Sequence, residues 1–514
     1  MGVPAVVHVR HRTLEPDLVP EPLTVPSRWA AARHPLVYEI DTWPWLAEIG
    51  ASEGRSVNLA TVPERHWDAI AEMGFDAVWL MGVWARSPAG IAAALADPSL
   101  VESFRAALPD WQPSDVVGSA YCVRSYDVDE HIGGRRGLAA ARSALAERGL
   151  GLLLDFVPNH VAMDHPWTTA HPEFFVAGSP AELLAEPQSF VDVAGRVLAN
   201  GRDPYFPAWR DVLQLNAFAP ALRAAAAATL TDIADQCDGV RCDMAMLMMN
   251  DVFARTWGPR VGDPPDTEFW PEAIAAVRRR HPAFTFVAEA YWDMEEPLQR
   301  QGFDFCYDKR LYDRLVDGDA AAVGDHLSAD TSFQDRLLRF VENHDEARAA
   351  AIFDPARLEA VTVATLTQAG ARLVHRGQLE GRTTHVPVFL GRAPREAVDS
   401  RVASFHRALL VILADDTFRS GSWSRCEVTG AGLLGWGWDG PRRWLIVVNL
   451  SASTASARVR VPWPDVLGRA HRLTDASSGI ARIHPGDELR DGWPVTLGSW
   501  QWRILAVEEV ASAR

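Results

Sequence analysis

Gly239-Val-Arg-Cys-Asp-Met-Ala-Met246 carries the clearest structural signal in the sequence. Its apolar residues alternate with Arg241 and Asp243, which is the period of a short buried strand. Arg241 and Asp243 therefore project to the same side, where a bidentate guanidinium can hold a carboxylate ionised and oriented. A fixed, ionised carboxylate at the end of a strand suits a covalent nucleophile, and a structural ion pair is the alternative.

This stretch is one of eight apolar runs that read as strands, each followed by a helical pattern or a long loop. The other runs cover residues 36–40, 76–81, 151–157, 285–289, 303–306, 337–342 and 371–375. Helical patterns cover residues 63–73, 134–148, 220–236, 355–368 and 404–414. Eight strands that alternate with helices predict an α/β protein of the closed (β/α)8 barrel type.

Departures from this alternation indicate the domain organisation. Residues 1–35 are rich in Pro and Arg and are predicted to form an N-terminal arm. The barrel is expected over 36–416, and it includes a small inserted domain at 161–219, because this segment is too long for an ordinary βα loop. From residue 417 to 514, strand-like runs alternate with Gly and Pro turns, which predicts a C-terminal antiparallel β-sandwich.

Composition excludes several classes of function. The 514 residues carry a formal net charge of −17, which disfavours nucleic acid and anionic membranes as partners. No apolar run is long enough to span a membrane, and the start of the chain lacks the pattern of a secretion signal. The five cysteines are scattered, as expected of reduced thiols in the cytoplasm. The 20 tryptophans would suit the binding of sugar rings, although many must be core residues.

Polar residues follow four of the predicted strands at their carboxyl ends, where the active sites of such barrels lie. Three carboxylates, two histidines and an arginine are expected to converge there: Asp243, Glu289, Asp345, His160, His344 and Arg241. Each could alone be a structural hydrogen bonder, but together they favour an active site. Two carboxylates that flank a glycosidic bond support retaining hydrolysis, in which one attacks the anomeric carbon and the other moves protons.

In combination, these segments resemble the four conserved regions of the α-amylase family, glycoside hydrolase family 13. The resemblance extends from about residue 36 into the C-terminal sandwich. It implies that Asp243 is the nucleophile, Glu289 the general acid/base and Asp345 the stabiliser of the transition state. Arg241 would orient the nucleophile.

The resemblance also implies residues that bind the sugar. His160 and His344 would bind hydroxyls of the sugar in the first subsite, and Tyr121 would stack on that sugar, a core tyrosine being its alternative. Trp292 follows the acid/base directly, and we expect it to bind substrate.

No metal or other cofactor is expected to be required. Many relatives bind calcium through a residue like Asn159, but the spacing of Asp192, Asp203 and Asp211 identifies none of them as its partner, so calcium stays open.

We therefore expect a cytoplasmic, retaining α-glycoside hydrolase that acts on small α-glucosides or α-glucan oligosaccharides. Three alternatives stay open: a transglycosylase of the same family, a glycoside phosphorylase and a non-catalytic scaffold. Aromatic residues of the inserted domain would wall the site into a pocket, or else pack that domain's own core: Trp167, Phe174, Phe175, Tyr205, Phe206 and Trp209. The exact glucoside, the linkage and the oligomeric state are left open.

Overall fold

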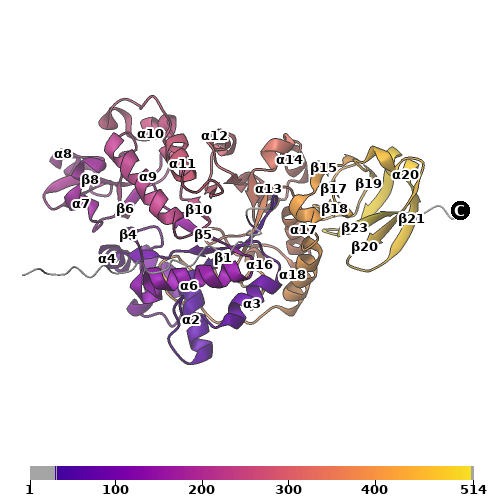
Figure 1. Cartoon of the computed structure of the whole chain (residues 1–514), viewed down its shortest axis with the longest axis horizontal. Coiled ribbons are helices and arrows are strands. Elements are labelled where there is room, and N and C mark those ends of the chain that lie inside the picture. Colours follow the sequence, from indigo (N-terminus) through magenta and orange to yellow (C-terminus); the bar gives the residue numbers. More distant parts are fainter. Residues whose placement is uncertain (1–28, 30–31, 511–514) are drawn as a thin grey trace, which may run out of the picture.

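Eight parallel strands close into a barrel in the computed structural model, which describes residue 29 and residues 32–510 (Figure 1). In barrel order, the strands are β1 (Leu36–Asp41), β14 (Ala371–His375), β13 (Leu337–Arg339), β12 (Phe305–Tyr307), β11 (Thr285–Ala288), β10 (Gly239–Cys242), β5 (Gly151–Phe156) and β2 (Ala77–Met81). The predicted barrel fold is confirmed. Most of the predicted N-terminal arm lies outside the described residues.

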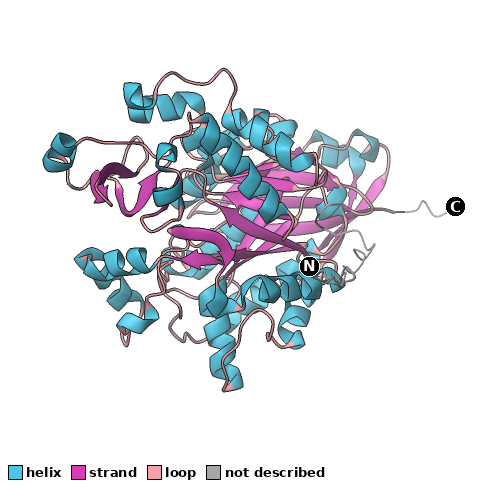
Figure 2. Ribbon diagram, turned by 60° about the vertical axis from the view of Figure 1, so that its left-hand side comes forward, coloured by secondary structure: helices cyan, strands magenta, loops and turns pink. Residues whose placement is uncertain are grey.

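Helices surround the barrel strands, as Figure 2 shows. The main ones are α2 (Thr42–Glu53), α3 (Glu64–Glu72), α6 (Gly134–Glu147), α9 (Pro220–Ala234), α11 (Phe269–Arg278), α13 (Lys309–Asp317), α17 (Pro355–Leu366) and α18 (Ser400–Leu413). In α9, Leu222, Ala226, Leu230 and Ile233 recur at helical spacing and are buried. Ala226, Leu230 and Ile233 pack in the main core with the barrel strands, and Leu222 packs in the small core of the inserted segment.

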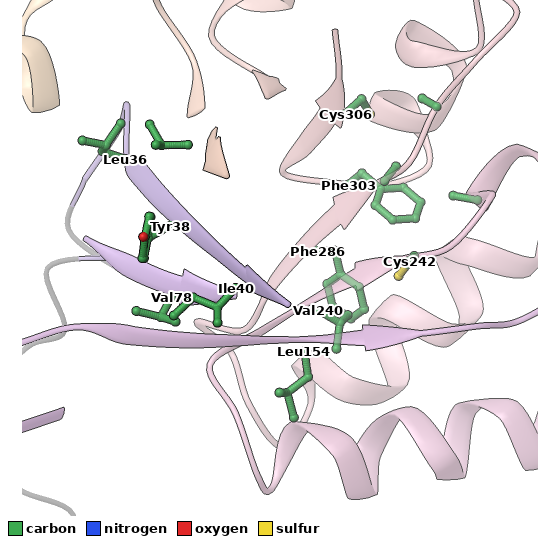
Figure 3. Packing of buried hydrophobic residues seen from close by; sticks show 14 of the residues in the cluster. Leu36, Tyr38, Ile40, Val78, Leu154, Val240, Cys242, Phe286, Phe303 and Cys306 are labelled. Atoms are coloured by element: carbon green, nitrogen blue, oxygen red, sulfur yellow. The ribbon is translucent and has the colours of Figure 1, made fainter. Parts of the chain in front are cut away.

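Side chains that point outward from the barrel strands form the main core. Leu154, Val240 and Phe286 come from neighbouring strands, are almost fully buried, and lie close together in Figure 3. Burying each such side chain stabilises the fold by about 1.5–3 kcal/mol. The residue after Val240 on β10, Arg241, points into the barrel. The core thus fixes the direction of the polar side chains at the mouth.

Four strands end earlier than the sequence predicts: β5 and β11 by one residue, and β10 and β13 by more. β10 ends at Cys242. Asp243 N still donates to Phe156 O of β5, but Ala245 N donates to Glu289 O, beyond the end of β11, and the chain turns across the barrel mouth. Met244 takes a left-handed φ of 42° at this turn. The predicted strand 337–342 likewise ends at Arg339. In both places the chain leaves the ladder where its polar residues reach the mouth.

The segment after β5 forms a four-stranded antiparallel sheet. Its strands lie in the order β6 (His160–Ala162), β9 (Trp209–Gln214), β8 (Arg196–Gly201) and β7 (Phe190–Val193). A second insertion, after β2, contains α4 (Pro88–Ala96) and α5 (Pro98–Ala107). The inserted sheet lies at one end of the long axis in Figure 1, and the C-terminal sheets lie at the other.

The C-terminal region consists of antiparallel sheets, as predicted. One contains β15 (Ser422–Arg425), β17 (Leu433–Asp439), β18 (Arg443–Asn449), β23 (Trp502–Glu509), β20 (Ala470–Asp475) and β21 (Ala481–Pro485). The other contains β16 (Glu427–Thr429), β19 (Ala455–Arg460) and β22 (Trp493–Leu497). Indole N–H groups of Trp436 and Trp438 donate to Thr367, just after α17, and tie the larger sheet to the barrel. Among the described helices, none has the length and apolar character needed to cross a membrane.

Candidate active site

A cavity of about 330 Å³ opens at the carboxyl ends of the barrel strands. Five of the eight site residues named from the sequence line it: Tyr121, His160, Asp243, Glu289 and Asp345. Arg241 and His344 lie buried next to these carboxylates. The structure therefore brings together seven of the eight residues at one place.

Arg241 is the electrostatic centre of the cavity floor. Its Nη1 donates to Asp243 Oδ1 at 2.8 Å, and its Nη2 lies 3.0 Å from Glu289 Oε2. The guanidinium side chain is only 1% exposed, and its Cζ lies 5.0 Å from the centroid of the Tyr121 ring. One buried cation thus faces both carboxylates and holds the oxygens of Asp243 in a fixed orientation.

Burial sets the protonation of the two carboxyls. Burial raises the pKa of Glu289 to about 7, and the Arg241 guanidinium opposes this rise. Burial also raises the pKa of Asp243, but the guanidinium and its hydrogen bond limit that pKa to about 6. The hydrogen bond from Arg241 favours the ionised form of Asp243, as a nucleophile needs, and burial favours the protonated form of Glu289, as an acid needs.

Two groups donate hydrogen bonds to Glu289. The backbone N–H of Met244, at the turn after β10, donates to Oε2, and the Tyr291 hydroxyl donates to Oε1 at 2.8 Å. Tyr291 also lines the cavity. It was not singled out from the sequence, although its place two residues after Glu289 on an extended segment was a usable signal.

His344 lies between Asp345, the third carboxylate, and Glu39 on β1. Its Nε2 lies 3.0 Å from Asp345 Oδ2 and 2.6 Å from the Tyr121 hydroxyl, and its Nδ1 is hydrogen bonded to Glu39. Although burial opposes it, the carboxylates of Asp345 and Glu39 raise the pKa of His344 well above its usual value. Sequence reasoning missed Glu39, whose only signal is a charge within the apolar run of β1.

The inserted sheet supplies one wall of the cavity. Trp209 and Asp211 on β9 line it, and the Trp209 ring lies 5.1 Å from the His160 ring. A loop after β14 supplies Phe389, whose carbonyl accepts a hydrogen bond from Val117 N at 2.8 Å. The cavity is therefore bordered by segments outside the eight strands.

The aromatic residues of the insertion divide into three groups. Trp167, Phe174 and Phe175 pack in the insertion's own small core, as the alternative interpretation held for them. Tyr205 and Phe206 are exposed, and Tyr205 lies edge-on against Trp292, with centroids 4.7 Å apart. Of the six, Trp209 borders the cavity. Trp292 itself is not among the described lining residues of the cavity.

The residues around Asn159 do not fit a calcium ion. Asn159 Oδ1 accepts a hydrogen bond from Gln214 Nε2 at 2.8 Å, so an amide donor already lies where a cation would have to bind. Asp203 accepts the backbone N–H groups of Tyr205 and Phe206, and Asp192 accepts that of Gly195. Within residues 32–510, no three His, Cys, Asp or Glu side chains form a cluster suited to a metal.

One curated relative matches part of the chain. The alpha-amylase MalA of Haloarcula japonica is 25% identical over 273 residues, which make up 50% of this chain and 35% of that protein. The chain therefore matches about a third of the relative's length. No family model matches the chain.

Solved structures match nearly the whole chain. A maltogenic alpha-amylase, AmyB, from Thermotoga neapolitana has a TM-score of 0.66 and 19% identity, over 92% of this chain and 98% of that one. The alpha-amylase of Geobacillus thermoleovorans, solved with acarbose, has a TM-score of 0.66 and 17% identity over 93% and 99%. A cyclic α-maltosyl-(1→6)-maltose hydrolase from Arthrobacter globiformis has a TM-score of 0.63 and 17% identity over 94% and 100%. At these identities the likeness establishes a shared fold.

Proposed function

We propose that this chain, whose resemblance to the α-amylase family is confirmed, is a retaining glycoside hydrolase of the α-amylase type that acts on α-glucans. The observation that carries the proposal is the position of Arg241, whose two terminal nitrogens lie 2.8 Å from Asp243 and 3.0 Å from Glu289. The buried Arg241 guanidinium favours the ionised form of Asp243, the nucleophile. Burial favours the protonated form of Glu289, the acid.

In the first step, Asp243 attacks the anomeric carbon and forms a covalent glycosyl-enzyme. Glu289 gives its proton to the departing glycosidic oxygen, so the leaving group departs as a neutral alcohol. Asp345, held by His344 at 3.0 Å, carries a negative charge beside the oxocarbenium-like transition state.

In the second step, Glu289, now ionised, takes a proton from water. The resulting hydroxide equivalent attacks the anomeric carbon and expels Asp243. Two inversions give net retention of the α configuration. The hydrogen bonds from Met244 N and Tyr291 keep Glu289 in the same place for both proton transfers.

We further propose that the substrates are small α-glucosides or the ends of α-glucan chains. The cavity of about 330 Å³ lies at the small end of the range for ligand sites, and Trp209, Asp211 and Phe389 border it. A walled pocket of this size accepts one terminal sugar and leaves little room for a chain to pass through.

Transglycosylation shares both steps, with a sugar hydroxyl in place of water, and remains the second candidate. Phosphorolysis is less favoured, because a phosphate would have to enter a cavity lined by the carboxylates of Asp211, Asp243, Glu289 and Asp345. Like charges repel strongly where water is excluded.

The experiment is a panel of small α-glucosides incubated with the purified protein, with and without phosphate, and with Asp243→Asn as the control. We expect free glucose as the main product, released first as the α anomer in proton NMR spectra. Asp243→Asn should lose turnover by several orders of magnitude and keep its circular dichroism spectrum. A β-anomer product would exclude double displacement, and a phosphate-dependent glucosyl phosphate would replace hydrolysis by phosphorolysis.

A further inference from the structure

Asp211 is a fourth carboxylate in the cavity, and none of the mechanistic steps uses it. It lies on β9 two residues after Trp209. Both line the cavity, whereas Arg210 between them is exposed. β9 therefore brings an acid and an indole ring to the same space.

The backbone of Asp211 is held on both sides. Cys122 Sγ donates to Asp211 O at 3.2 Å, and Asn200 Nδ2 donates to the next carbonyl, Val212 O, at 3.0 Å. β9 also pairs with β6, where Ala162 lies opposite Val212 and His160 opposite Gln214. Asp211 is thus fixed relative to His160 and is not part of a free loop.

The charge of Asp211 differs from that of the other cavity carboxylates in having no partner. Asp243 and Glu289 face Arg241, and Asp345 faces His344. Asp211 has no ion pair among the described residues, and no described side chain donates a hydrogen bond to its carboxylate. Burial raises the pKa of Asp211, and its own backbone N–H and the nearby His160 side chain oppose this rise. A half-buried carboxylate without a side-chain donor or an ion-pair partner can accept hydrogen bonds from whatever fills the cavity.

We propose that Asp211 is a substrate-binding residue that accepts hydrogen bonds from hydroxyls of the terminal sugar beside His160, and that it restricts the site to neutral sugars. The inference rests on the proposed function and adds the class of sugar. A neutral hexose supplies hydroxyl donors to the carboxylate. If the hydroxyl that faces Asp211 carried a phosphate, the phosphate dianion would be repelled by the Asp211 carboxylate. Such a sugar is therefore excluded.

The test compares wild type, Asp211→Asn and Asp211→Ala on p-nitrophenyl α-glucoside, on its 3-, 4- and 6-deoxy analogues, and on the 6-phosphate. Asp192→Asn is the matched control, because Asp192 is an exposed carboxylate on the same inserted sheet. The Asp211→Ala variant should lose about 10- to 100-fold in kcat/KM on the parent glucoside, the range of a charged hydrogen bond.

The pattern across the analogues decides the proposal. Wild type should discriminate strongly against at least one deoxy analogue, and Asp211→Ala should act on that analogue almost as well as wild type does. Asp211→Asn should also reduce the discrimination against the 6-phosphate. Equal losses on every substrate, or no loss on any, would overturn the assignment, provided that the melting temperatures agree.

Failure of the proposed function gives a different result. If wild type hydrolyses no α-glucoside, the proposed function falls, and calorimetric binding of glucose and its deoxy analogues to wild type and Asp211→Asn then tests Asp211. Weaker binding of glucose, with unchanged binding of one deoxy analogue, still supports the inference. Equal affinities of both proteins for every sugar, or binding of none, would overturn it.

Discussion

Glu289 has to act both as an acid and as a base, and its environment favours neither state completely. Burial favours the proton, while Arg241 and two hydrogen-bond donors favour the charge. This balance places the pKa of Glu289 near neutrality, where both proton transfers, to the leaving group and from water, are efficient. The chemistry at this residue therefore depends on its neighbours as much as on the carboxyl itself.

Glu289→Gln should separate the two steps. A substrate with a good leaving group needs no acid, so it should still form the glycosyl-enzyme, while turnover of natural α-glucosides falls about 10²–10⁴-fold. Added azide needs no base, so it should restore turnover and give an α-glycosyl azide. Equal losses on activated and natural substrates, with no effect of azide, would remove Glu289 from the acid/base role.

Tyr291→Phe should shift the pH profile. The Tyr291 hydroxyl donates to Glu289 Oε1 and stabilises the ionised form, so removing it should raise the pKa of Glu289. Because Glu289 must be protonated in the first step, the alkaline limb of kcat/KM should move to higher pH by up to about one unit. An unchanged alkaline limb would show that Tyr291 has no influence on this group.

The sequence could predict the residues that sit at strand ends, because a barrel brings those ends together. Asp243, Glu289 and Asp345 were predictable in this way. Asp211 was not, since its place depends on how an irregular insertion folds back across the mouth. Glu39 was missed for a related reason: its partner, His344, is 305 residues away in the chain, and no local pattern reports that contact.

At the level of elements, the part of the inserted sheet that borders the cavity depends on close packing at Gly201, the last residue of β8. A Cβ at Gly201 would lie 2.9 Å from Val212 Cγ2, 3.1 Å from His160 Cβ and 3.2 Å from Trp209 Cε3. The ladder between β8 and β9 is irregular at this point. Only glycine allows β8 to approach the β6–β9 pair this closely.

Gly201→Ala should therefore damage the cavity wall. The added methyl should cost about 1–3 kcal/mol of stability through overpacking and should raise KM for α-glucosides by displacing Trp209 or His160. Gly195→Asn is the control, because a side chain there meets open space and asparagine tolerates its left-handed φ of 80°. Thermal melts and Michaelis profiles give both readouts. A Gly201→Ala variant as stable and active as the control would contradict this account.

The sequence predicted all eight barrel strands by type, and both ends of β14, but it missed at least one end of each of the others. An alternation of apolar and polar residues indicates a strand only where one face of the segment stays buried. At 243–246 and 340–342 the residues remain apolar or alternating, yet the ladders have ended, and Ala245 N donates to Glu289 O beyond the end of β11. The pattern of side chains is a local property of the sequence. The end of a strand depends on whether the neighbouring strands continue beside it.

At the scale of the whole molecule, the position of the insertions should decide between a pocket and a cleft. An endo-acting enzyme needs a groove open at both ends, whereas here the inserted sheet and the loop carrying Phe389 border the cavity. We expect activity on small α-glucosides and almost none on soluble starch blocked at its non-reducing ends. A rapid fall in viscosity of the blocked starch would show an open cleft.

The closure of the barrel between β1 and β14 also has a consequence for biosynthesis. Residues 36–39 of β1 pair with residues 372–375 of β14. This pairing can form only after about three quarters of the chain has left the ribosome. Arg372 then donates from Nη2 to Phe418 O, a contact that needs still later residues. Until that point the edge of β1 that later pairs with β14 is exposed and can pair with other chains. Nascent chains of this protein should therefore depend on chaperones until translation is nearly complete.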